Sequence, residues 1–427
     1  MKSEKNVPRL RFPEFRGSGE WEEMKLEKIG RPISGLSGKS ASDFGTGKPY
    51  VTYMQVFNCA WIDFTKCGRV LIADNENQNT LQLGDILFTT SSETPNEVGF
   101  ASVLIDSPPE PTYLNSFCFS FRPNDLDMLI PKFSCYLFHS TNYRKSISAL
   151  AQGITRYNIS KGAFLNLRLL IPKEKAEQQK IADCLSSLDD LISAQSQKIE
   201  ALKAHKKGLM QQLFPAEGET TPKWRFPEFR ESGWGGKTLG QVGEFTGGGT
   251  PSKDNQSFWK GNIPWISSSD IDEDSIYQLT VSRFITAEAL KNSATKMVPA
   301  NSILLVSRVG VGKLAITKES ICTSQDFTNF TPTKNDNLIF IAYYLKYHSK
   351  DLLVFSQGMA IKGFTKDNIS KFKILIPSKK AEQQKIADCL SSLDDLISAQ
   401  SQKLEALKAH KKGLMQQLFP AADDRDI

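Results

Sequence analysis

The chain has 427 residues, enough for two or three domains with separate cores, and its 40% hydrophobic content is that of a globular protein. No apolar run is long enough to cross a membrane and the first residues lack the apolar core of a signal peptide, so the sequence predicts a cytoplasmic protein. A net charge of +6 is too small to identify a nucleic-acid binder, so contacts with phosphates would need local patches or a partner subunit.

The chain opens with a lead segment, residues 1–20, that contains the sequence RFPEFR. We expect residues 21–172 to form a mixed α+β domain, with a helical stretch at residues 133–150. Short apolar runs bounded by Gly, Asn and Pro predict strands at residues 50–57, 85–89 and 117–121.

Residues 173–214 predict a single helix of roughly 40 residues, because Pro172 precedes it, Pro215 follows it, and Gly208 is the one potential breaker between them. Its apolar residues are spaced alternately four and three apart, which is typical of the contact line of a coiled coil. The apolar members of this line are Ile181, Leu185, Leu188, Ile192, Ile199 and Leu202, and Gln195 occupies the position between Ile192 and Ile199.

The same order of parts then returns. A linker at residues 215–235 repeats RFPEFR, residues 236–377 form a second domain, residues 378–420 a second helix, and residues 421–427 a tail. The second domain predicts strands at residues 263–266, 302–307 and 327–330 and a helical stretch at residues 338–355. The second contact line consists of Ile386, Leu390, Leu393, Ile397, Leu404 and Leu407.

The helices are far more alike than the domains. Of the 41 residues from Ala176 to Ala216, only Ile199 differs from its counterpart 205 positions later, Leu404, whereas the two domains differ at most positions. Identical helices suggest that both face the same kind of partner, and dissimilar domains suggest that they read two different things.

We expect the helices to pair antiparallel within one chain. A parallel pair in register would set Lys206 against Lys411 in a dry contact line, which is unfavourable. An antiparallel pair places Lys206 near Leu393 and lays the acidic early half of each helix along the basic later half of the other. The alternative is a zipper between separate chains.

Motifs of catalysis are not recognisable. The glycine-rich stretches at Gly38, Gly47 and Gly312 lack the spacing of a phosphate-binding loop, and no signature of an amino-methyltransferase or an S-adenosylmethionine loop is found. The acidic run Asp270–Asp274 lacks the lysine of a nuclease site, and the seven cysteines and four histidines show no metal-ligand spacing. We therefore predict a chain that is not an enzyme on its own, with reduced thiols and no cofactor or metal.

Side chains suited to reading base edges lie in loops of both domains, although ordinary turn chemistry is an alternative for each one. In the first domain the candidates are Thr89, Thr90, Ser91, Ser92, Arg156 and Tyr157. In the second domain they are Ser267, Ser268, Ser269, Arg308, Lys313 and Lys362.

The order of parts resembles the specificity subunit of a type I restriction-modification system over essentially the whole chain. The phrases that carry the resemblance are GGGTPSKDNQSFWKGNIPWISSSDI from Gly247, GDILFTTSS from Gly84, NSILLVSRVGVGK from Asn301, and AEQQKIADCL from Ala176 and from Ala381. The resemblance implies a non-catalytic DNA reader whose two target-recognition domains each read one half of a bipartite, asymmetric sequence. It also implies that the helices dock two methyltransferase subunits, through which restriction subunits join.

We expect the partner surface on the outward faces of the helices, which carry several uncharged residues, although these could instead widen the contact between the helices. They are Leu191 and Ala194 with their repeats Leu396 and Ala399, together with Ala182, Ala201, Ala387 and Ala406. The competing interpretation of the whole chain is a coiled-coil adaptor with two protein-binding heads.

Overall fold

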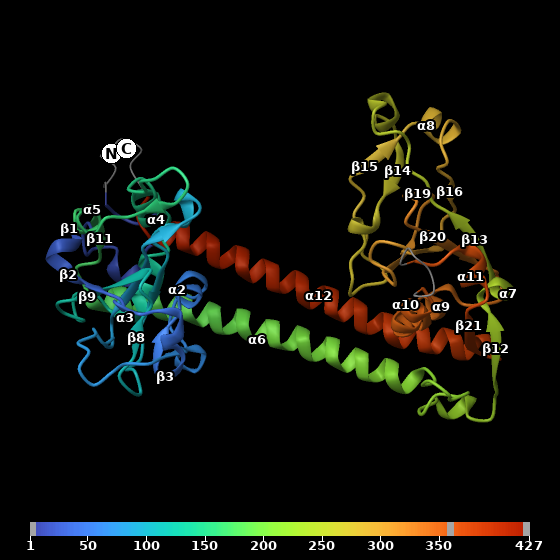
Figure 1. The fold of residues 1–427 in the computed structure, drawn as a ribbon, viewed down its shortest axis with the longest axis horizontal. Coiled ribbons are helices and arrows are strands. Elements are labelled where there is room, and N and C mark those ends of the chain that lie inside the picture. Colours follow the sequence, from blue (N-terminus) through green and yellow to red (C-terminus); the bar gives the residue numbers. More distant parts are fainter. Residues whose placement is uncertain (1–5, 357–362, 422–427) are drawn as a thin grey trace. The chain divides into compact units, whose positions relative to one another are not determined.

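The computed structural model describes residues 6–356 and 363–421 (Figure 1). The chain divides into two compact units. The first consists of Met1–Gln195 and Lys403–Ile427, and the second is Ser196–Gln402. The division falls in the middle of both long helices, α6 (Lys175–Leu213) and α12 (Lys380–Leu418), so each unit contains half of each helix.

The first unit contains a four-stranded antiparallel sheet in the order β2-β9-β5-β7, formed by Gly30–Ser34, Cys118–Pro123, Ile86–Thr89 and Ala101–Val103. A second sheet has the order β4-β3-β8, from Gly68–Val70, Phe44–Val51 and Tyr113–Leu114, and its β3-β8 pair is parallel. Two short antiparallel ladders pair β1 (Glu22–Lys25) with β11 (Arg168–Ile171) and β6 (Ser91–Ser92) with β10 (Tyr157–Asn158).

The helices of the first unit cover the buried face of its larger sheet. Phe88 and Phe119 of that sheet pack with Phe164 of α5 and Phe138, which follows α3, in a core with Leu185 of α6. The shorter helices are α1 (Leu26–Ile29), α2 (Tyr53–Asn58), α3 (Pro131–Leu137), α4 (Thr141–Ser148) and α5 (Lys161–Leu165).

The second unit has the same plan. Its antiparallel sheet has the order β13-β20-β17-β18, from Gly243–Gly247, Thr328–Pro332, Ser302–Leu305 and Leu314–Thr317. A mixed sheet has the order β15-β14-β19-β16, from Arg283–Ile285, Ile263–Ile266, Ile321–Thr323 and Met297–Val298, and its β14-β19 pair is parallel. An antiparallel ladder pairs β12 (Trp234–Thr238) with β21 (Lys373–Pro377). Its shorter helices are α7 (Leu239–Val242), α8 (Ala287–Lys291), α9 (Leu338–Tyr347), α10 (Ser349–Ser356) and α11 (Lys366–Ser370).

Corresponding strands therefore occupy corresponding places in the two sheets. The parallel pairs illustrate this, because Tyr50 lies opposite Tyr113 in the first unit as Trp265 lies opposite Cys322 in the second. The mixed α+β fold and the internal repeat that the sequence predicts are confirmed, even though the two domains share few residues.

The RFPEFR segments anchor each domain to its long helix. Arg11 makes two hydrogen bonds to the Glu177 carboxylate, at 2.8 and 2.7 Å, and Trp21 donates a third at 3.2 Å. Arg225 and Trp234 hold Glu382 in the same way, at 2.9, 2.7 and 3.2 Å.

The glutamine that follows this glutamate in each AEQQ phrase makes further hydrogen bonds to the backbone of the domain. The Gln178 amide accepts from the backbone of Ile130 and donates to Pro172. Gln383 accepts from Asn337 and donates to Pro377. The AEQQ and RFPEFR phrases recur because they form one buried polar junction in each unit.

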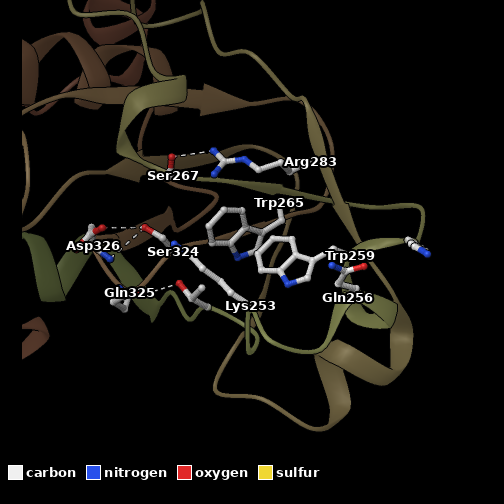
Figure 2. Close-up of a pocket in the computed structure, with 11 residues that line it drawn as sticks. Lys253, Gln256, Trp259, Trp265, Ser267, Arg283, Ser324, Gln325 and Asp326 are labelled. Carbon is white, nitrogen blue, oxygen red and sulfur yellow. Dashed lines mark hydrogen bonds between the residues drawn. The ribbon is translucent and has the colours of Figure 1, made fainter.

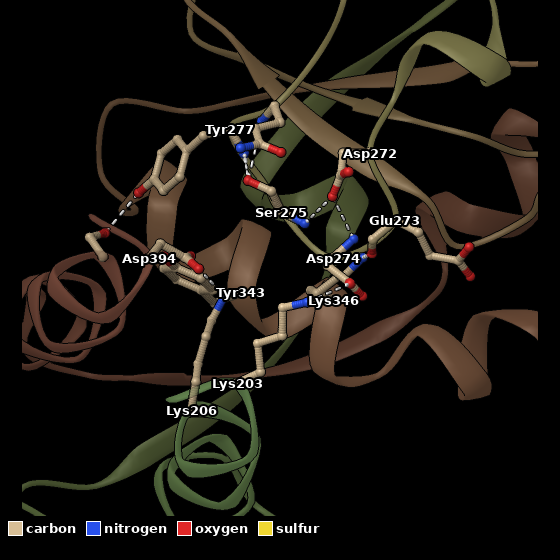
Figure 3. A network of polar contacts seen from close by, with 12 residues as sticks. Lys203, Lys206, Asp272, Glu273, Asp274, Ser275, Tyr277, Tyr343, Lys346 and Asp394 are labelled. Atoms are coloured by element: carbon tan, nitrogen blue, oxygen red, sulfur yellow. Dashed lines mark hydrogen bonds and ion pairs between the residues drawn. The ribbon is translucent and has the colours of Figure 1, made fainter. Parts of the chain in front are cut away.

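The two long helices contact each other in opposite directions in both units. In the first unit Lys411 of α12 pairs with Asp189 of α6 at 2.6 Å, and the Tyr136 hydroxyl donates to the same carboxylate at 2.9 Å. In the second unit Lys206 pairs with Asp394 at 2.5 Å, and Tyr343 donates to it at 2.5 Å (Figure 3). These groups, called here the Lys-Asp-Tyr triads, tie a domain to both helices.

The antiparallel direction agrees with the expectation that like charges would be kept apart. All twelve residues of the two predicted contact lines are buried or partly buried. A regular coiled-coil geometry along the whole length stays a prediction.

An acidic loop also joins the second domain to the helices (Figure 3). Asp274 lies 3.7 Å from Lys203 of α6, and the Glu273 carbonyl accepts from Lys346 of α9. Asp272 uses its carboxylate to accept from the backbone of Asp274. The acidic run is thus a structured turn that contacts the helices.

Most predicted strands are found, and three predicted elements need correction. Residues 50–57 are a strand only to Val51, because the Thr52 hydroxyl accepts from the backbone of Gln55 and starts α2. The stretch at residues 133–150 is two helices, because Ser140 caps a new one. The stretch at residues 338–355 breaks at His348, between α9 and α10.

Candidate nucleic-acid interface

The second domain contains an open groove of about 640 Å³ beside strand β14 (Figure 2). Its walls combine aromatic, cationic and hydroxyl-bearing side chains, chiefly Lys253, Trp259, Lys260, Trp265, Ser267 and Arg283. Ser324, Gln325 and Asp326, which follow β19, complete it. We refer to it as the β14 groove.

The glycine-rich phrase from Gly247 builds this groove by close backbone packing. A Cβ atom on Gly248 would lie 1.9 Å from the Ser324 carbonyl oxygen, and one on Gly249 would lie 2.4 Å from the Ala294 backbone. Glycine is therefore required at both positions. The Gly249 carbonyl accepts from the Trp265 indole at 2.9 Å, which fixes the ring in the wall.

The cations of the groove are not equivalent. The Arg283 guanidinium lies 4.7 Å over the Trp265 ring, and Arg283 forms an ion pair with Asp270 and donates to Ser267 at 2.8 Å. Its charge is therefore largely compensated. Lys253 and Lys260 are exposed, and within residues 6–356 and 363–421 no acidic side chain forms an ion pair with either.

The corresponding place in the first domain has different electrostatics. Phe44 and Tyr50 contact each other at 5.1 Å, as Trp259 and Trp265 do at 5.0 Å. Lys39 lies in the loop before β3, as Lys253 lies in the loop before β14. The Lys39 side chain forms an ion pair with Glu76 at 2.6 Å and is 6% exposed. Hydrogen bonds from Lys39, Gln78 and a backbone amide lower the pKa of Glu76 to about 2, so the pair is charged at neutral pH.

The structure brings the predicted contact residues of the first domain together. Tyr157 of β10 lies opposite Ser92 of β6, and Arg156 lies 5.8 Å from the ring of Phe117, which is 55% exposed. Thr90 is partly buried beside them, and its carbonyl accepts from the backbone of Ile159. Thr90 and Ser92 are thus brought next to residues more than 60 positions later in the chain, Arg156 and Tyr157.

Three of these residues have internal roles. Thr89 is buried, and its hydroxyl accepts from the backbone of Phe100 at 3.0 Å. Ser91 and Ser92 are also buried, and Ser92 donates to Glu97. These three side chains offer little or no surface to a base edge in this structure, and their contact with DNA stays a prediction.

The predicted residues of the second domain fall into separate places. Ser267 lines the β14 groove, and Ser268 and Ser269 follow it in a short 3-10 helix. Arg308 is exposed beyond β17, and Lys313 lies 3.7 Å from Glu273. Lys362 lies outside the described residues. Sequence reasoning missed Lys253, Trp259, Lys260 and Arg283, although the phrase from Gly247 contains the first three of them.

The predicted partner surface is exposed in part. Leu191 and Leu396 are 54% and 39% exposed, and Ala194, Ala399, Ala201 and Ala406 are exposed as well. Ala182 and Ala387 are fully buried in the domain cores, so assigning them to the outward face was wrong. Each faces its own domain because it lies near the start of its helix, where the domain packs.

Within the described residues no helix is long and apolar enough to cross a membrane, and no group of three or more His, Cys, Asp or Glu side chains is arranged to hold a metal ion. The seven cysteines are free thiols, and burial raises the pKa of Cys118 to about 12, so its thiol stays protonated at neutral pH.

Two domains of one topology, each tied to the same pair of repeated helices, define an internally duplicated recognition protein. The sequence profile described as "Type I restriction modification DNA specificity domain" matches residues 18–204 and again residues 231–409, which together exceed half of the chain. The chain therefore belongs to the family of type I restriction-modification specificity subunits. Members of this family recognise DNA, and this chain is not an enzyme on its own.

Curated relatives agree with this assignment. The putative type I restriction enzyme MjaX specificity subunit of Methanocaldococcus jannaschii is 28% identical over 413 residues, 94% of this chain and 93% of the relative. The MjaIX specificity subunit of the same organism is 36% identical over 179 residues, which is 41% of each chain. The HindI specificity subunit of Haemophilus influenzae is 24% identical over 432 residues, 84% of this chain and 90% of the relative.

Solved structures share the fold. The S subunit of a type I restriction-modification system from M. genitalium superposes with a TM-score of 0.59 at 16% identity, over 98% of this chain and all of that one. A chain from a study of complex assembly and conformational transition of the type I system superposes with a TM-score of 0.62 at 16% identity, over 94% and 98%.

Proposed function

We propose that this chain reads a bipartite, asymmetric DNA sequence, one half with residues 21–172 and the other with residues 236–377. In this proposal the two long helices set the gap between the half-sites and dock two methyltransferase subunits. Restriction subunits then join through those methyltransferases.

The observation that carries the proposal is the contrast between scaffold and surface. The larger sheets of both domains use the same strand order and both domains have the same Arg-Glu junction, yet equivalent loops carry different side chains, such as Lys39 paired with Glu76 in one and Lys253 exposed in the other. A duplicated scaffold with diverged loops supports the recognition of two different sequences. We propose that Thr90, Arg156 and Tyr157 contact DNA in the first domain, and Ser268, Ser269, Arg308 and Lys313 in the second.

The test is an exchange of residues 236–377 for the matching domain of a relative with a known recognition sequence. We expect methylation-site sequencing of a genome that carries the hybrid and its methyltransferase to show one half-site replaced and the other unchanged, because each domain has its own core. The matched control exchanges residues 21–172 and should replace the opposite half. A change of both half-sites in either hybrid would contradict independent reading.

The second part of the proposal places methyltransferase contacts at Leu191 and Leu396, which are equivalent in the repeat and exposed on long helices. Changing both to Glu puts charges where apolar side chains would be buried, so we expect loss of the methyltransferase complex in size-exclusion chromatography, with the helical content unchanged. The control changes Leu71 and Leu83, which are 48% and 40% exposed but lie off the helices, to Glu. A complex that survives the helix substitutions would contradict this surface.

The adaptor interpretation stays distinguishable. A coiled-coil adaptor with two protein-binding heads would show no preference for one DNA sequence. Sequence-specific binding by the assembled complex would therefore exclude it.

A further inference from the structure

The β14 groove has a composition that suits one particular part of DNA. It offers two exposed lysines, the partly buried Trp259 and several hydroxyl and amide groups within about 640 Å³. A bare phosphate needs much less space, whereas a phosphate with its deoxyribose would contact both the cations and the aromatic side chain. The groove lies in a domain that the proposed function assigns to DNA, and the inference below rests on that function.

Insertion of an unstacked base is less compatible with the same geometry. Stacking requires a free ring face. Trp265 is 3% exposed, has the Arg283 guanidinium over one face of its ring, and lies nearly perpendicular to the Trp259 ring, with 5.0 Å between the ring centres (Figure 2). One face of Trp265 is therefore already occupied by a protein group, whereas Lys253 and Lys260 are exposed to solvent.

The charge distribution favours an anion at the rim. Lys253 and Lys260 are exposed and lack an acidic partner among the described residues, and Arg283 is held by Asp270. The lining also contains a carboxylate, Asp326, which accepts from the Ser324 hydroxyl at 3.2 Å and would repel a phosphate placed beside it. A backbone phosphate would thus bind to the lysines, with the sugar towards Trp259.

We propose that the β14 groove binds a sugar-phosphate segment of one DNA strand, with Lys253 and Lys260 contacting phosphates and Trp259 contacting the deoxyribose. The first domain lacks an exposed lysine at the equivalent place, because Lys39 is buried against Glu76. The two domains therefore contribute unequally to the affinity for DNA. The second supplies a larger electrostatic part of the affinity, independent of base sequence.

Salt dependence measures this directly, because each phosphate contact contributes about 0.9 to the slope of log K against log salt concentration. The assembled complex with Lys253→Gln and Lys260→Gln should lose about 1.8 from that slope on a duplex that contains the full site. Between 50 and 200 mM salt, wild-type affinity should fall roughly twelvefold more than that of the variant. The methylated sequence should be unchanged, since phosphates carry no base information.

Two controls separate charge from location. Lys334→Gln with Lys373→Gln removes the same charge from exposed lysines outside the groove and should leave the slope unchanged. Trp259→Ala should weaken binding several-fold at every salt concentration without a change of slope, as expected for a sugar contact. A wild-type slope in the Lys253/Lys260 variant would overturn the proposal.

Two further measurements distinguish base insertion from backbone binding and test the proposed function separately from this inference. A strong fluorescence increase from 2-aminopurine in the half-site of the second domain, at a position other than the methylated base, would show base extrusion and overturn the backbone assignment. A wild-type complex without sequence preference would contradict the proposed function, whereas sequence-specific binding with an unchanged variant slope would contradict only this inference.

Discussion

Single residues carry the junction between each domain and its helix. The carboxylates of Glu177 and Glu382 are each 1% exposed, and each is held by an arginine of the RFPEFR segment and by an indole. A buried carboxylate that loses its arginine is left with an uncompensated charge, which is far worse than replacing the whole pair by apolar groups.

We therefore expect Arg225→Met to lower the free energy of unfolding of the second unit by about 3–5 kcal/mol. Adding Glu382→Leu should recover most of that loss, because no charge then stays buried. Thermal unfolding of the assembled complex, followed by protection of peptides of the second unit from hydrogen exchange, measures both variants. A double variant as unstable as the single one would show that the hydrogen-bond geometry, and not the buried charge, dominates.

His139 makes the first unit sensitive to acid. Its ring nitrogen Nε2 lies 2.8 Å from the Ala101 carbonyl oxygen, and burial lowers its pKa to about 4. Because an unfolded histidine has a pKa near 6.5, the unfolded chain binds the extra proton first as the pH falls. Stability from this residue is thus complete above about pH 6.5 and is lost as the pH falls towards 4, by at most about 3 kcal/mol.

A variant with His139→Gln keeps a side-chain donor but cannot titrate. Its melting temperature should therefore depend less on pH between 6.5 and 4.5 than that of the wild type. The difference between the two profiles isolates this residue from the carboxylates that titrate in the same range. Parallel profiles would mean that His139 is protonated in the folded protein.

Residue-level prediction from sequence failed where a role depends on contacts from distant segments. Thr89 resembles a loop residue in the phrase GDILFTTSS, but it accepts a backbone hydrogen bond inside the core. Lys253 and Lys39 both look like exposed loop cations, and only the position of Glu76 in space distinguishes them. Chain neighbours carry no signal for such pairs.

At the scale of elements, prediction was better because periodicity reports packing directly. The predicted helix at residues 173–214 matches α6 closely, since the proline flanks and the apolar spacing act within one element. The helical stretch at residues 133–150 was too long because the cap at Ser140 leaves the hydrophobic pattern almost intact. The antiparallel direction followed from charge alone, and the Lys-Asp-Tyr triads show the physical reason.

At the scale of the whole molecule, the triads allow a test of the proposal that the long helices set the gap between the two DNA half-sites. We consider adding one heptad after Gln195 and another after Gln400. The two members of each Lys-Asp pair lie on the same side of these insertions, so both triads can still form. The helices become about 10 Å longer, equivalent to about three base pairs. We expect methylation-site sequencing to show a gap longer by about two to four base pairs with the same half-sites.

Binding by the lengthened complex should also weaken. Three base pairs rotate the second half-site by about 100° around the duplex, so the DNA must twist or bend. The control inserts a heptad into one helix only, which cannot keep both triads in register and should destabilise the chain. A doubly lengthened complex with full affinity for the original gap would show that the helices do not set the spacing.

The two long helices end in the same kind of contact with a domain. At the end of α6 the Gln212 carbonyl accepts from the backbone of Trp224, and at the end of α12 the Gln417 carbonyl accepts from Leu10 in the same manner, at 3.0 and 2.9 Å. Phe214 packs into the core of the second domain and Phe419 into the core of the first. Each helix end is therefore fastened to a domain by the same set of noncovalent contacts, whichever segment of the chain supplies them.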